Sequence, residues 1–244
     1  MKLKMCCILL PLFAALPAHA IGINSMLEYV DSSGRAEFII TNSEDSRQYI
    51  NVQLAELLVE NGDIRKLPYS RENVNKWVMS AHPSRAIVEP GFKKTFLLMH
   101  QPIVGEPDFN KDRVFQVSFV PSPYFDEDEL AKENSTVKMA FGFAPIVIIP
   151  AKEPQPLTYK MTYHDDRVMV ENNGNTAFSL FLDGCPEKII DKERGKCTTN
   201  ATVLAGRNLS IPLPTAMVGK STLKAKLATY GNKFSADVTL KKQS

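Results

Sequence analysis

The chain has little of the charge imbalance and histidine that many functional sites require. Outside its first twenty residues, which contain Lys2 and Lys4, the 29 basic residues fall to 27 and equal the 27 acidic ones. A neutral chain lacks the basic excess that neutralises phosphates, so we do not expect it to bind nucleic acid. The later histidines, His82, His100 and His164, have no metal-ligand or catalytic spacing. We therefore expect no enzyme activity, no cofactor and no metal site.

Long apolar runs are also absent after the N-terminus. Residues 1–20 combine an early positive charge, an apolar run over residues 6–16 and the small-residue ending Ala18-His-Ala20. This is the three-part pattern of a secretory signal peptide, with cleavage expected after Ala20. An uncleaved membrane anchor is the alternative, but the run is shorter than the ~20 residues that span a bilayer. The sequence predicts export of a mature protein without a membrane span.

Cysteine is sparse as well. Cys6 and Cys7 lie in the predicted signal peptide, which leaves Cys185 and Cys197 in the mature chain. A single pair in an oxidising compartment favours a disulfide. A redox or metal pair would need closer spacing or further ligands, and the sequence offers neither.

Period-two alternation of apolar and polar residues recurs along most of the mature chain. Examples are residues 50–54, 113–120, 209–213, 223–227 and 234–238. Such alternation predicts half-buried strands, and turn signals separate them. The number of strands is about twice what one sandwich needs, so we predict an all-β protein of two immunoglobulin-like β-sandwich domains.

A proline-rich segment at residues 150–156 marks the predicted boundary between the domains. We assign residues 21–150 to the N-terminal domain and residues 151–244 to the C-terminal domain. Because proline fixes φ and favours an extended path, the joint should be stiff. A stiff joint predicts two domains at a fixed angle with a cleft between them.

Two short segments resemble ligand-binding motifs but lack residues that those motifs require. Residues 121–135 are strongly acidic, yet they lack the spacing of a calcium loop and are predicted to be a hairpin loop. Gly219-Lys-Ser-Thr222 copies the end of a phosphate-binding loop, but Pro214 stands where the motif requires glycine. An alternating stretch follows it, whereas phosphate binding needs a helix N-terminus.

The most unusual strand follows the acidic segment, at residues 136–150. Val137, Met139, Phe141 and Phe143 fall on one face, while the residues between them are small apart from Lys138. Burial of the large face in the domain's own core is one reading of this pattern.

The order of local motifs resembles that of periplasmic pilus chaperones of the chaperone–usher pathway. It comprises a short first strand (residues 21–30), a second strand ending at Asn42, the segment Pro83-Ser-Arg-Ala-Ile-Val-Glu-Pro-Gly91, the strand 113–121, the long loop and the apolar strand 136–150. In the second half, residues 170–176 precede the cysteine pair. The resemblance spans nearly the whole mature chain and is greatest to the branch that serves class 5 and related fimbriae.

The resemblance implies a periplasmic protein that binds fimbrial subunits and delivers them to an outer-membrane usher. A subunit of this kind lacks one strand, and the chaperone supplies it by pairing with the exposed edge. The implied donor strand covers residues 136–143, and the implied subunit-binding residues are Val137, Lys138, Met139, Phe141 and Phe143. Self-association of the free protein through the same edge is a further expectation.

One departure concerns the basic pair with which the better-known branch anchors the subunit terminus. Residues 21–30 and 144–149 contain no lysine or arginine. Lys138 and Arg113 lie on neighbouring strands, but neither is at the expected position.

The rival functions are a fimbrial or adhesin subunit and a receptor-binding module. The first should carry an alternating N-terminal extension, and the second should expose aromatic residues on loops.

Overall fold

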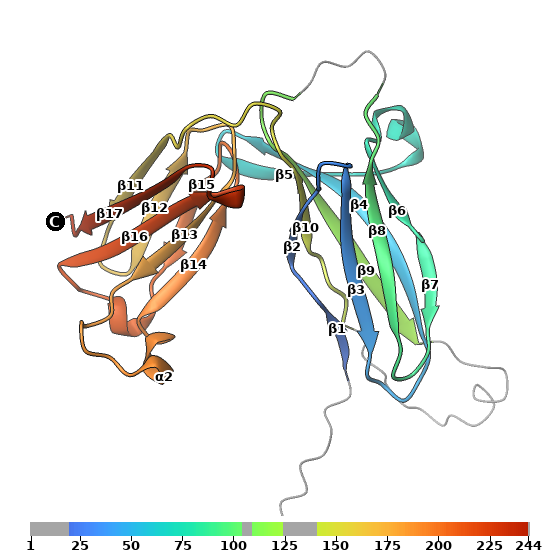
Figure 1. Ribbon diagram of the computed structural model, residues 1–244, viewed down its shortest axis with the longest axis horizontal. Coiled ribbons are helices and arrows are strands. Elements are labelled where there is room, and N and C mark those ends of the chain that lie inside the picture. The colour runs from blue at the N-terminus through green and yellow to red at the C-terminus, as the bar shows by residue number, and fades with distance from the viewer. Residues whose placement is uncertain (1–19, 104–108, 124–140, 244) are drawn as a thin grey trace, which may run out of the picture.

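The computed structural model describes residues 20–103, 109–123 and 141–243. They form two β-sandwiches that meet at an angle (Figure 1). The first sandwich contains β1 to β10 and the second contains β11 to β17. The predicted all-β, two-sandwich fold is confirmed.

The first sandwich packs a four-stranded sheet against a six-stranded sheet. The four-stranded sheet has the order β1 (Ile21–Ile23), β3 (Arg35–Asn42), β8 (Lys93–His100), β6 (Met79–His82). The six-stranded sheet has the order β2 (Leu27–Tyr29), β10 (Ile146–Ile149), β9 (Arg113–Pro123), β4 (Gln48–Glu60), β5 (Asp63–Pro68), and β7 (Arg85–Val88) also pairs with β4. A 3₁₀ turn, η1 (Arg71–Lys76), connects β5 to β6.

The second sandwich is smaller and has short helical turns in its connections. One sheet has the order β11 (Tyr159–Tyr163), β12 (Arg167–Asn172), β15 (Asn208–Pro212), and the other has the order β14 (Thr198–Val203), β13 (Phe178–Asp183), β16 (Thr222–Thr229), β17 (Ser235–Lys241). The turns are α2 (Asp191–Arg194), η2 (Thr215–Met217) and η3 (Tyr230–Asn232). No helix in the described ranges is long and apolar enough to cross a membrane.

The alternating residues form the two cores. On β9, Phe115, Val117 and Phe119 are at most 1% exposed, as their spacing predicts. Phe119 packs edge-to-face against Phe38 and Phe96 of the opposite sheet. The strands therefore pair in the register that buries their apolar face, because a slip of one residue would expose it.

The first predicted strand, residues 21–30, is split between the two sheets. β1 pairs with β3, whereas β2 pairs in parallel with β10. The side chain of Asn24 accepts a hydrogen bond from the Ile39 amide at 2.7 Å, which secures the crossing between the sheets. The apolar residues of the two halves also pack differently: Ile21 and Ile23 lie against the first core, whereas Leu27 and Tyr29 lie against the cluster at the joint between the sandwiches.

The predicted hairpin loop at residues 121–135 begins later than expected. β9 continues to Pro123, where the register pairs it with Gln48 of β4. Cross-strand pairing to β4 overrides the two prolines at this edge. Residues 124–135 lie outside the described residues.

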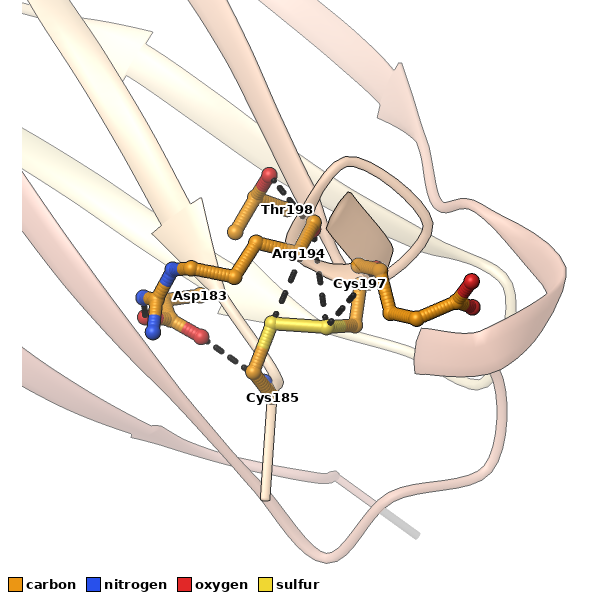
Figure 2. Close-up of a disulfide and its surroundings, with 6 residues drawn as sticks. Asp183, Cys185, Arg194, Cys197 and Thr198 are labelled. Carbon is orange, nitrogen blue, oxygen red and sulfur yellow. Dashed lines mark hydrogen bonds and ion pairs between the residues drawn. A yellow bond between two sulfur atoms is a disulfide. The ribbon is translucent and has the colours of Figure 1, made fainter. Parts of the chain in front are cut away.

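The predicted disulfide between Cys185 and Cys197 is present, with 5.0 Å between the Cα atoms (Figure 2). Asp183 Oδ1 accepts a hydrogen bond from the Cys185 amide, and its Oδ2 pairs with Arg194, both at 2.7 Å. The carbonyl of Arg194 accepts hydrogen bonds from the Cys197 amide and the Thr198 hydroxyl. Side-chain and backbone contacts thus hold the loop in the geometry that the disulfide needs.

Candidate functional site

The segment just before β10 forms an edge of the six-stranded sheet. Phe143 exchanges two backbone hydrogen bonds with Phe119 of β9, at 2.8 and 3.1 Å. Since successive residues of an extended chain point their N–H and C=O groups to opposite sides, those of Gly142 and Ala144 point away from β9. β2 covers only the next residues, Ile146 to Ile148. Among the described residues, nothing pairs with this part of the edge.

The aromatic side chains of the segment have different surroundings. Phe143 packs against the first core, whereas Phe141 is 74% exposed. A Cβ atom at Gly142 would lie 2.8 Å from the carbonyl oxygen of Phe119, so glycine is needed for this close approach. The other candidate residues, Val137, Lys138 and Met139, lie outside the described residues.

The joint between the sandwiches has an apolar centre. Leu57, Val114 and Ile148 of the six-stranded sheet pack with Ala177 and Leu204 of the second sandwich, and each is at most 9% exposed. Burial on this scale stabilises the contact by about 25 cal/mol for each Å² removed from water. The outer face of β4, β9 and β10 is therefore anchored on the second sandwich at this end.

Asp112 links both sandwiches at the same joint. Its Oδ1 accepts a hydrogen bond from the Ala151 amide and its Oδ2 accepts one from the Ala177 amide, both at 2.7 Å. The Asp112 amide donates to the carbonyl of Asn175 at 2.9 Å. Burial raises the pKa of Asp112, and the two amide donors oppose that shift. Sequence reasoning missed Asp112, because a lone aspartate before a strand has no distinguishing pattern.

The tip of the β4–β5 hairpin makes a second polar contact between the sandwiches. The carbonyl of Gly62 accepts hydrogen bonds from the Asn208 amide, at 2.9 Å, and from the Arg207 guanidinium. Arg207 also pairs with Asp63 at 2.6 Å. Gly62 has a φ of 83°, and a Cβ atom there would lie 2.3 Å from Asn208 Nδ2. Glycine is required both by the turn and by the contact.

A third contact joins the sandwiches through aromatic rings. Tyr29 of β2 stacks on Tyr230 of η3, with 4.1 Å between the ring centroids. Burial, and secondly the nearby Asp112, raise the pKa of Tyr29 to about 12. A cavity of about 430 Å³ lies by the joint, between the segments 56–60 and 109–114 and Ala205 of the second sandwich. Several separate contacts therefore hold the angle between the sandwiches.

Arg113, which the sequence offered as one possible subunit contact, is engaged within the first sandwich. Its Nε lies 2.8 Å from Glu56 Oε1, and both side chains are largely buried. The guanidinium also lies over the rings of Phe109 and Phe115. An unpaired charge would be costly at this burial, and the ion pair with Glu56 avoids that cost. In the described part of the chain, no group of three or more His, Cys, Asp or Glu residues is arranged to hold a metal ion.

Comparison with known protein families identifies the family of this chain. The family model for the CS5 fimbrial protein N-terminal domain matches residues 23–150. The chain belongs to this family. A relative described as an uncharacterized 25.9 kDa protein in the CS5 3′ region of Escherichia coli is 27% identical over 191 residues, which cover 76% of this chain and 77% of the relative.

Solved structures share the fold of this family member. A chain of the Salmonella enterica complex between SafA pilin and the SafB chaperone gives a TM-score of 0.57 at 9% identity, covering 93% of this chain and 98% of that one. The class 5 fimbriae chaperone CfaA gives a TM-score of 0.50 at 10% identity, covering 90% and 98%. The resemblance to chaperones of the chaperone–usher pathway is thereby confirmed.

Proposed function

We propose that this protein is a periplasmic chaperone that binds and stabilises fimbrial subunits by donating a strand and then delivers them to an outer-membrane usher. The observation that carries the proposal is the edge before β10, where backbone groups point outward and Phe141 is 74% exposed. An extended edge with apolar side chains supplies what a subunit without its last strand needs. The function requires no covalent chemistry and no cofactor.

The donor segment is proposed to be residues 136–143. Val137, Met139 and Phe141 would enter the subunit groove, and Lys138 would lie on the other face by alternation. Phe143 would mark the end of the inserted stretch, because its ring already packs against the chaperone's own core. Residues 1–20 would direct export, and the domains would extend over residues 21–150 and 151–244.

Coexpression with a fimbrial subunit in a periplasm tests this proposal. The test variant is Met139→Asp with Phe141→Asp, and its folding is checked by circular dichroism. We expect the subunit to accumulate with the wild type and to be degraded with the folded variant. The matched control is Val74→Asp with Phe92→Asp, two other exposed apolar positions in the first sandwich. Equal accumulation with the test variant and the wild type would overturn the proposed donor strand.

Delivery requires a surface that stays accessible while the donor edge is occupied. The outer face of the six-stranded sheet exposes Ile87 and Val120, which are 46% and 42% exposed. Ile87 lies across from Tyr49 of β4, and Val120 lies across from Asn51, two residues further along the same strand. Exposed apolar side chains gathered on one face indicate a contact site. We expect Ile87→Asp with Val120→Asp to keep the subunit stable but to stop fimbriae from reaching the surface. Normal surface assembly would exclude this face as the usher contact.

A further inference from the structure

A pocket of about 560 Å³ opens on the side of the first sandwich away from the joint. It forms where the chain leaves the six-stranded sheet. Tyr69 still donates its amide to the carbonyl of Leu54, and Ser84 accepts from the amide of Val52, but residues 70–83 cross to the other sheet. β4 therefore loses its neighbour at Gln53, and a passage opens between the two sheets.

Part of the pocket wall is apolar, beside polar side chains that include Gln53, Ser80 and Ser118. Met79, which is 1% exposed, lines it together with Leu54. Tyr69 and Trp77 also line it, and their rings stack at 4.9 Å and are nearly parallel. Trp77 is 38% exposed and is fixed by a 2.7 Å hydrogen bond from its Nε1 to Asn73. The aromatic and aliphatic part of the wall suits a large apolar side chain, and the polar part leaves room for its backbone.

Two backbone groups add to the polar part of the pocket. The carbonyl of Leu54 accepts a hydrogen bond from the Tyr69 amide, so the N–H of Leu54 also points to the side of β4 where Tyr69 lies. By the same argument, the carbonyl of Val52 points toward Ser84. In residues 20–103, 109–123 and 141–243, neither group has a hydrogen-bond partner. They can bind the backbone of an entering segment.

The mouth of the pocket carries positive charge. Lys66 and Arg85 line it, both are exposed, and neither forms an ion pair within the described residues. No aspartate or glutamate lines the pocket. Arg85 lies directly across from Asn51, whose other neighbour is Val120, so the mouth continues into the surface that contains Ile87 and Val120. Charge complementarity therefore favours an acidic segment.

We propose that this pocket binds an aromatic or large aliphatic side chain presented by an acidic segment of the protein that docks on the adjoining face. The apolar side chain enters between Met79 and the Tyr69–Trp77 stack, and its acidic neighbours lie near Lys66 and Arg85. Only the identity of that partner as the usher rests on the proposed function. Binding at the pocket can be measured without subunit or usher, so the two proposals can fail separately.

The experiment uses the full mature chain and three blocked tripeptides: acetyl-Asp-Phe-Asp-amide, acetyl-Asn-Phe-Asn-amide and acetyl-Lys-Phe-Lys-amide. Because Trp77 is the only tryptophan of the chain, its fluorescence reports directly on the pocket wall. We expect a saturable change with the acidic peptide at a Kd of about 1 mM or below, with weaker binding of the amide peptide and least of the basic one. The Leu54 amide should shift in the nitrogen–proton NMR spectrum over the same range.

Charge variants complete the test. Lys66→Glu with Arg85→Glu should weaken binding of the acidic peptide about tenfold. The matched control, Lys224→Glu with Lys226→Glu, makes the same charge change on exposed residues of the second sandwich and should bind as the wild type does. Equal binding of acidic and basic peptides, an unchanged Kd in the Lys66/Arg85 variant, or an unperturbed Leu54 amide and Trp77 would each overturn the proposal.

Discussion

Replacing Gly62 by alanine tests whether the hairpin contact fixes the angle between the sandwiches. At a φ of 83°, alanine costs about 1 kcal/mol in backbone strain. Its Cβ atom would also lie 2.3 Å from Asn208 Nδ2, so the hairpin or the second sandwich must move. Moving them breaks the bonds that the Gly62 carbonyl accepts from Asn208 and Arg207, which adds about 1–3 kcal/mol.

The matched control is Gly91→Ala. Gly91 has a φ of 77°, and nothing lies within 4 Å of a Cβ atom there. The Gly91→Ala variant therefore loses stability through backbone strain only. Urea unfolding followed by circular dichroism should show a larger loss for Gly62→Ala by at least about 1 kcal/mol. X-ray scattering should show a larger radius of gyration for that variant only. Equal losses in the two variants, with unchanged scattering, would refute a structural role for the contact.

Three further predictions follow from side chains with distinct surroundings. In urea unfolding, Phe143→Ala should lower the free energy of unfolding by about 2 kcal/mol, whereas Phe141→Ala should change it by less than about 0.5 kcal/mol. Similar losses in the two variants would contradict the different burial of the two side chains. Burial, and then Arg113, lower the pKa of His100 below 6.5, so the unfolded chain binds more protons as the pH falls below that value and stability drops. His100→Gln should reduce this drop in melting temperature, and an unchanged pH profile would contradict it. Replacing Cys185 and Cys197 by serine should cost about 3 kcal/mol, and an unchanged urea midpoint would exclude a stabilising disulfide.

The fold could be predicted because it depends on local alternation. The spacing of Phe115, Val117 and Phe119 identified β9 and its buried face, and the cysteine count identified the disulfide. The switch of the first strand between sheets was missed, because the pairing of β2 with β10 joins residues more than a hundred positions apart.

The joint between the sandwiches could not be predicted for a similar reason. Gly62 and Arg207 are separated by 145 positions, and each is ordinary in its own segment. The partners of Arg113 were equally hidden: its position on β9 made it a possible subunit contact, and the structure adds Glu56 and two aromatic rings as its neighbours within the first sandwich. A single sequence does not show which charged residues find partners across the fold.

Hydrogen exchange of the purified complex between this protein and a fimbrial subunit, compared with the free protein, tests strand donation most directly. Donation predicts strong protection on binding of the amides of Gly142 and of the alternate residues before it in 136–143, because these outward groups pair with the open edge of the subunit. The amides of β6, on the far edge of the other sheet, should exchange as in the free protein. Protection elsewhere, with residues 136–143 exchanging at the same rate in both states, would contradict the proposed function.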